Sequence, residues 1–206
     1  IRMPNHPLFL ALLKLSNTAF AAPSANPYKS LSPVSAEQVL AGLEGKIAGI
    51  VDGGFSSVGV ESTILDLTQT PYRVLRSGPL SGDELAAVAG VTIHSPELHD
   101  VAVSGNVQDH YQPKTPLRLV SRAEMLSQMT KRATKAAYVT IGEYGETSAD
   151  PLRVSMPDTA AAYAQMLYKT LHELDKHKPE VIWCEMPNGK SWAYIIDRLR
   201  KASCNY

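Results

Sequence analysis

The first residues that could do chemistry lie in a short loop rich in proline and small side chains. Residues 21–27 include Pro23 and Pro27, which fix their own φ angles and remove two backbone donors. Each proline also moves the residue before it toward extended geometry. The loop therefore presents the Ser24 hydroxyl and the Asn26 amide with little freedom, which suits recognition of a polar ligand. The alternative interpretation is an ordinary surface turn with a Ser or Asx cap.

Further polar motifs flank this loop. They are R-M-P-N-H-P at residues 2–7, D-G-G at 52–54, V-G-V-E-S-T at 58–63, L-R-S-G at 75–78 and H-Y-Q-P at 110–113. The planar guanidinium of Arg2 suits bidentate binding of a carboxylate, although an exposed arginine near a chain end would look the same in sequence. Taken together, the motifs are more specific than any one of them.

This ordered set resembles the YrdC-like domain of threonylcarbamoyl-AMP synthases over residues 1–80, and the resemblance resumes at 110–113 and at the C-terminus. That family joins L-threonine, bicarbonate and ATP into threonylcarbamoyl-AMP and pyrophosphate, for threonylcarbamoyladenosine formation in tRNA. A carbamate must attack the α-phosphate in line, so catalysis rests on positioning and electrostatic stabilisation. The resemblance implies ATP as a substrate with Mg²⁺, and tRNA or tRNA-modification proteins as partners.

The same resemblance implies a role for individual residues. The threonine-binding residues would be Arg2, Ala22 and Ser62, and the ATP-binding residues would be Ser24, Asn26, Ser32, Arg76 and Tyr111. No side chain is assigned as a catalytic or metal-ligating group. Two of these residues have simpler alternatives, because Ser32 could mark a turn that begins a helix and Ser62 could be a polar strand residue.

Composition argues against several other classes of protein. Lys plus Arg and Asp plus Glu both number 20, and a net charge of zero does not favour a nucleic-acid coat. The six histidines lack H-x-x-H spacing and G-x-S-x-G is absent, which argues against zinc and serine-hydrolase sites. The two cysteines do not suggest a disulfide framework, which favours the cytoplasm. No apolar run reaches the roughly eighteen residues of a membrane span.

The elements that must position these residues fall into two parts. We expect a partial YrdC-like twisted α/β domain over residues 1–90, a linker over 91–116, and a small Rossmann-like parallel-sheet domain over 117–206. In the first part, apolar patterns and capping residues predict helices over 8–15, 35–44 and 81–90 and strands over 47–51, 62–67 and 72–76.

The second part alternates strands and helices. Strands are predicted over 117–120, 137–141, 153–155 and 180–185, and helices over 121–133, from an Asp158 cap through Leu174, and over 191–202. Such alternation predicts a parallel sheet with helices on its faces. The basic residues of the last helix, Arg198, Arg200 and Lys201, are interpreted as a solvated face, with an RNA-binding face as the alternative.

Two rival functions remain open at this point. A non-catalytic RNA-binding or regulatory relative would share the fold, but it would not need the hydroxyl and guanidinium set and should be more basic. A carbamoyl-transfer maturation module would need zinc-finger or acylphosphatase-like segments, which this sequence lacks. The chain opens on Ile1 inside a motif, so we expect an N-terminal part of the natural protein to be absent and synthase activity from this chain alone to be weak.

Overall fold

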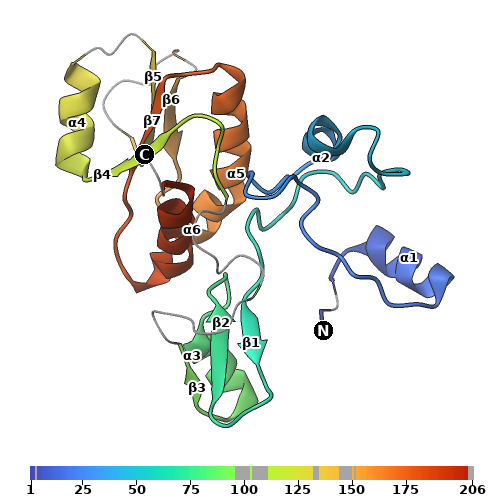
Figure 1. The fold of residues 1–206 in the computed structure, drawn as a ribbon. Coiled ribbons are helices and arrows are strands. Elements are labelled where there is room, and N and C mark those ends of the chain that lie inside the picture. Colours follow the sequence, from blue (N-terminus) through green and yellow to red (C-terminus); the bar gives the residue numbers. More distant parts are fainter. Residues whose placement is uncertain are drawn as a thin grey trace.

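The computed structural model shows two separate sheets joined by long connections (Figure 1). It describes residues 1–2, 4–95, 103, 111–131, 135–143, 150 and 152–203. One sheet has three strands in the order β1-β2-β3, and the other has four in the order β4-β7-β5-β6. The predicted mixed α/β class with a separate parallel sheet is therefore confirmed.

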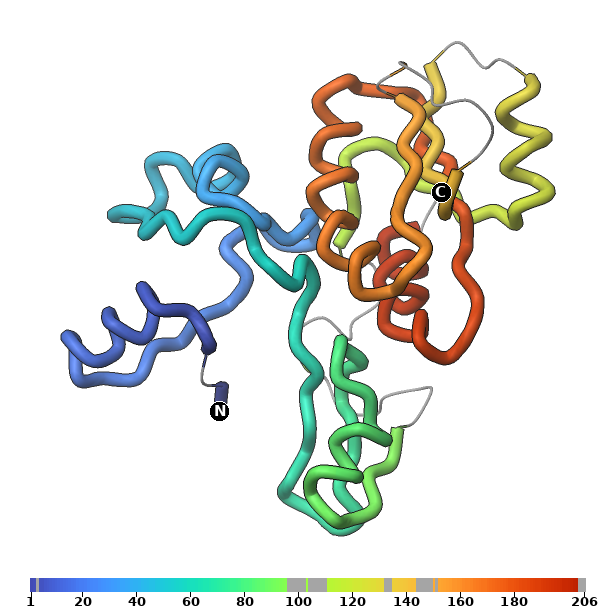
Figure 2. The backbone as a smooth tube through the Cα atoms, turned by 180° about the vertical axis from the view of Figure 1, so that it is seen from behind, coloured from blue at the N-terminus to red at the C-terminus, as the bar shows by residue number. Residues whose placement is uncertain are grey.

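The N-terminal segment forms an arm that projects from the two sheets (Figures 1 and 2). Its helices are α1 (Pro7–Ser16) and α2 (Ala36–Leu43). Proline at the first position of α1 and the Ser35 hydroxyl, which accepts a bond from the backbone N–H of Gln38, agree with the helix starts predicted from the sequence. Neither helix contains a buried residue, and Leu15 of α1 is 86% exposed.

The strand predicted over residues 47–51 is wrong. These residues form no strand, and Ile47, Ile50 and Val51 are 40%, 38% and 66% exposed. A short apolar run becomes a strand only where a neighbouring strand satisfies its backbone groups and another layer covers its side chains. No strand in the described part of the chain lies alongside this run, so its backbone stays irregular.

The small sheet follows the arm. β1 (Ile64–Asp66) pairs antiparallel with β2 (Tyr72–Arg76), and β2 pairs in parallel with β3 (Ile93–His94). The crossover between β2 and β3 is α3 (Gly82–Ala89), which has the full capping box of Ser81 and Glu84. β3 lies inside the segment predicted to be a linker, so the small sheet extends further than expected. Most of the remaining linker falls outside the described residues.

The larger sheet is parallel throughout, as predicted. It contains β4 (Leu117–Val120), β5 (Ala136–Ile141), β6 (Arg153–Met156) and β7 (Val181–Glu185). Its helices are α4 (Arg122–Thr130), α5 (Ala160–Lys176) and α6 (Ala193–Ser203), the last following the 3₁₀ turn η1 (Lys190–Trp192). The helix start at Asp158 is corrected by one residue, because Thr159 is the N-cap and makes no side-chain cap bond.

Alternation along the strands divides the core of this sheet between its two faces. Ala137 and Val139 of β5 belong to a large cluster with α5 and α6, whereas Ala136 and Tyr138 pack with Met125 of α4. The large cluster also takes in residues from distant parts of the chain, namely Leu31, Val34 and Tyr111. The base of the arm is therefore anchored on α5, where both views show the two segments meeting (Figures 1 and 2).

Candidate functional site

A broad cavity of about 1130 Å³ lies where the arm, the small sheet and α5 meet. Its wall includes all but one of the residues predicted from the motifs, namely Arg2, Ala22, Ser24, Ser32, Ser62, Arg76 and Tyr111. The exception is Asn26. The cavity is slightly larger than the usual small-molecule site, whose volume runs to about 1,000 Å³.

Asn26 shapes the loop that carries Ser24. Its side-chain N–H group donates to the carbonyls of Pro27 (3.0 Å) and Ser30 (2.9 Å), and its backbone N–H donates to the carbonyl of Ser24 (3.0 Å). Both side-chain bonds are donated by the amide nitrogen to main-chain carbonyls, so they hold the turn that follows Ser24. Asn26 thus acts on the cavity through loop geometry, while Ser24 lines it.

Arg2 and Ala22 lie next to each other although they are far apart in sequence. Nη2 of Arg2 donates to the carbonyl oxygen of Ala22 at 2.8 Å. A guanidinium has five N–H donors, so this bond leaves others for an anion in the cavity. Both residues were assigned to the threonine site by resemblance, and the structure places them together on one part of the wall.

Arg76 is the last residue of β2, and its side chain binds the loop that precedes β1. Its side chain is buried, and Nε and Nη2 both donate to the carbonyl oxygen of Ser62, at 3.0 and 2.9 Å. The antiparallel pairing explains this contact, because it places Arg76 opposite Ile64, two residues after Ser62. Burial lowers the pKa of Arg76, but a guanidinium stays protonated in proteins, so the cavity keeps this positive charge.

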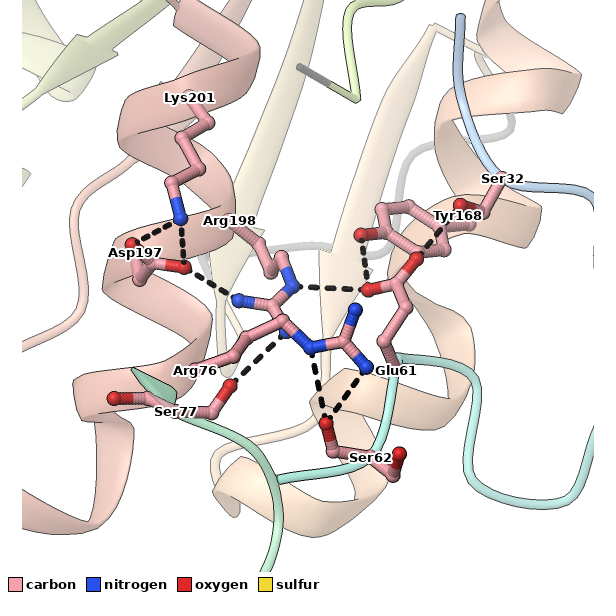
Figure 3. Close-up of polar contacts among 9 residues, drawn as sticks. All are labelled: Ser32, Glu61, Ser62, Arg76, Ser77, Tyr168, Asp197, Arg198 and Lys201. Carbon is pink, nitrogen blue, oxygen red and sulfur yellow. Dashed lines mark hydrogen bonds and ion pairs between the residues drawn. The ribbon is translucent and has the colours of Figure 1, made fainter. Parts of the chain in front are cut away.

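Glu61 is a wall residue that the sequence analysis did not identify. Its carboxylate accepts bonds from the Ser32 hydroxyl (2.6 Å), the Tyr168 hydroxyl (3.1 Å) and Nε of Arg198 (2.9 Å), as Figure 3 shows. Burial would raise the pKa of Glu61, but the charge of Arg198 and the hydrogen bonds lower it more, so the net shift is downward. Ser32 is thus held by Glu61, and its carbonyl also contacts Nε2 of His172 at 3.2 Å.

Tyr111 is packed between aromatic and cationic groups. Its ring stacks on Tyr168 with centroids 5.7 Å apart, and the guanidinium carbon of Arg198 lies 5.1 Å from its centroid. The backbone of Tyr111 has a φ of 64°, in the left-handed region. The next residue, Gln112, donates its N–H to the carbonyl of Lys29 at 2.9 Å, which attaches this end of the linker to the arm.

The solvated face predicted for the last helix is wrong at Arg198. Arg198 is 0% exposed, and Lys201 is largely covered and binds Asp197, whereas Arg200 is exposed. The helical spacing of the apolar residues could have identified Arg198 as buried. Residues 194, 195, 198, 199 and 202 of α6 are all buried, and Arg198 falls within this apolar stripe.

The described residues do not supply a metal centre. They contain no group of three His, Cys, Asp or Glu side chains placed to hold an ion. Among the described residues of the cavity wall, Glu61 is the only carboxylate, and its oxygens already accept three hydrogen bonds. A protein-held Mg²⁺ does not fit this wall. None of the described helices has the length and apolar character needed to cross a membrane.

Comparison with known proteins identifies the family of the chain. Residues 80–204 match the protein family described as "Threonylcarbamoyl-AMP synthase, C-terminal domain", and residues 1–78 match the family described as "Telomere recombination". The chain belongs to the threonylcarbamoyl-AMP synthase family. The synthase of Pyrococcus abyssi is 34% identical and that of Bacillus subtilis is 35% identical, each over 98% of this chain.

The crystal structure of P. abyssi Sua5 complexed with L-threonine superposes with a TM-score of 0.79 at 33% identity, over 98% of this chain. The chain spans 63% of the length of the P. abyssi relative and 62% of the B. subtilis relative. The family is therefore established for nearly the whole chain, while the chain covers less than two thirds of these synthases.

Proposed function

We propose that this protein acts in the synthesis of L-threonylcarbamoyladenylate from L-threonine, bicarbonate and ATP. Pyrophosphate is the second product, and the adenylate serves threonylcarbamoyladenosine formation in tRNA. The observation that carries the proposal is the shared cavity, to which residues from five motifs spread over more than a hundred positions all contribute. The similarity to a Sua5 structure complexed with L-threonine supports an amino-acid site in the same fold.

In this proposal the wall has two parts. Arg2, Ala22 and Ser62 bind threonine, and the guanidinium of Arg2 faces the carboxylate. Ser24, Ser32, Arg76 and Tyr111 bind ATP, and Asn26 maintains the loop that carries Ser24. Arg76 serves both parts of the wall, because it donates two hydrogen bonds to the Ser62 carbonyl and adds positive charge beside the nucleotide.

The proposed reaction uses these residues mainly to position its reactants. The threonine amine forms a C–N bond to the carbon of bicarbonate and water leaves, which gives a carbamate. A carbamate oxygen then bonds to the α-phosphorus of ATP, and the bond from that phosphorus to pyrophosphate breaks. Negative charge grows on the leaving group, and the guanidinium of Arg76 stabilises it. Mg²⁺ enters as part of the ATP substrate, because the described residues contain no set of three carboxylate, histidine or cysteine side chains that could hold the ion.

We also propose the wider context of this activity. The chain is divided into the small-sheet unit with its arm, a linker, and the parallel-sheet domain from residue 117 onward. The location is the cytoplasm, and tRNA or tRNA-modification proteins are the partners that receive the adenylate.

The test is binding, followed by turnover. Calorimetry with purified protein should detect ATP and L-threonine, with D-threonine as the stereochemical control. Pyrophosphate release should require L-threonine and bicarbonate together, at a weak rate for this chain. If neither ATP nor L-threonine binds, the proposal is wrong. A thermal shift with tRNA that disappears with added salt, in the absence of any ATP effect, would favour the RNA-binding alternative instead.

A further inference from the structure

Arg198 of α6 is a buried arginine whose guanidinium contacts three polar groups and one aromatic ring. Nε donates to Glu61 at 2.9 Å, Nη2 donates to the carbonyl of Ser77 at 3.0 Å, and Nη1 pairs with Asp197. Its guanidinium also lies over the ring of Tyr111. The side chain is 0% exposed and does not line the cavity, so it would act on a ligand only through its neighbours.

The two main partners of Arg198 stand next to residues of the proposed site. Glu61 immediately precedes Ser62, and Ser77 immediately follows Arg76. Arg76 in turn donates twice to the carbonyl of Ser62. Figure 3 shows that Arg198 bonds to both loops, at Glu61 in one and at Ser77 in the other, and that Arg76 connects the two loops by bonding to Ser62. A shift of Arg198 would therefore reach both loops at once.

Backbone packing confines the same two loops. A Cβ added at Gly78 would lie 2.3 Å from the backbone nitrogen of Thr63, so the loops are in direct contact. Gly59 has a φ of +80°, and a Cβ there would lie 2.3 Å from the carbonyl oxygen of Ala164 on α5. The loop over residues 59–63 is thus enclosed between Gly78 and the C-terminal domain, which leaves it little room to adjust without moving its partners.

We propose that Arg198 is a positioning residue for the cavity. From α6 it fixes the Glu61 and Ser77 loops and so sets the geometry in which Ser62 and Arg76 face a ligand. This role rests on the proposed function for its ligands, ATP and L-threonine. A rigid, planar fork can hold a carboxylate and a carbonyl together, whereas a lysine ammonium has no such fixed geometry. Sites lose affinity when their supporting contacts loosen by about 1 Å.

The first experiment needs no ligand. Hydrogen exchange of the free protein is compared between Arg198→Lys and Arg200→Lys, a matched change at an exposed arginine of the same helix. Peptides covering residues 59–63 and 76–78 should exchange about tenfold faster in Arg198→Lys, while β5 and β7 stay protected as in the parent protein. Equal exchange of these loops in the two variants would overturn the proposal, whether or not any substrate binds.

The second experiment separates positioning from stability. In calorimetry, Arg198→Lys should weaken ATP and L-threonine binding by about tenfold, and Arg200→Lys should not. The double variant Arg198→Met with Glu61→Gln removes both charges, so it should recover melting temperature relative to Arg198→Met without recovering affinity. Recovery of both would show a merely structural role. If the parent protein binds neither ligand, the proposed function fails, and hydrogen exchange alone decides the positioning role.

Discussion

Three arginines, two that line the cavity and one that lies behind its wall, donate hydrogen bonds to oxygen atoms of the protein itself. Arg2 and Arg76 each donate to a backbone carbonyl, and Arg198 is shared between a carbonyl and the carboxylate of Glu61. Buried or partly buried charges with such partners are costly to remove, because the remaining group loses its compensation. Single substitutions should therefore separate binding from stability when they are compared with matched controls.

Arg76→Met should weaken binding of ATP. The change removes a buried cation and its two hydrogen bonds to the Ser62 carbonyl. A hydrogen bond to a charged group is worth about 1.5–3 kcal/mol, so the loss of one such contact with ATP should raise the Kd for ATP about ten- to a hundredfold. Arg73→Met on the same strand is the control, since Arg73 pairs with Asp66 away from the cavity wall. Calorimetry measures both. An unchanged ATP affinity in Arg76→Met would remove Arg76 from the nucleotide site.

Glu61 should make the folded protein sensitive to acid. Its folded pKa lies below the ordinary value of 4.5, so the folded state takes up this proton less readily than the unfolded chain does. The contribution is present above pH 4.5 and is lost as the pH falls through the folded pKa. Urea unfolding between pH 7 and 3 should show a shallower acid loss in Glu61→Gln than in the parent, and Glu180→Gln, at an exposed position, should resemble the parent.

The sequence could identify single residues only where a motif carried them. The hydroxyl and guanidinium groups of the motifs line one cavity, and the Asn26 amide donates to carbonyls of its own loop. Glu61 and Arg198 could not be paired from sequence, because they are 137 positions apart and each has an ordinary alternative as a solvated charge. Their pairing depends on how α6 is placed beside the loops that precede β1 and follow β2, which no local pattern encodes.

Among the secondary-structure elements, those with local signals were predicted best. β2 and β4 have the predicted bounds, and the Ser81 capping box is present in full. Caps and turns depend on neighbouring residues, so the sequence carries them directly. The failed strand over 47–51 depended instead on a distant pairing partner. The parallel sheet was predictable because the alternation of strands and helices itself restricts the topology.

The contact between the two site loops predicts a sensitive glycine. Gly78→Ala places a carbon 2.3 Å from the nitrogen of Thr63, which forces the loops apart and should lower the free energy of unfolding by about 1–3 kcal/mol. Gly49→Ala is the control, since an added carbon there meets nothing within 4 Å. Urea titrations give both values. Equal stability of the two variants would mean that the loops separate easily.

Across the whole molecule, burial is unevenly distributed. α1 contains no buried residue, whereas α5 contains seven and packs on the central strands of the parallel sheet. Native-state hydrogen exchange should therefore show rapid exchange in α1 and the slowest exchange in β5, β7 and α5. Comparable protection of α1 and β5 in the free protein would contradict this gradient and would indicate that another surface covers the arm.

The long separation between Arg198 and Glu61 has a consequence for synthesis on the ribosome. The loop bearing Glu61 emerges first, and its cationic partner follows 137 residues later. Until α6 has left the exit tunnel, the Glu61 carboxylate must remain hydrated, and the Glu61 and Ser77 loops lack their contacts with Arg198. If Arg198 positions these loops, we expect the pocket to form late during translation. A nascent chain stalled before α6 would then carry every motif of the first 113 residues without the geometry that unites them.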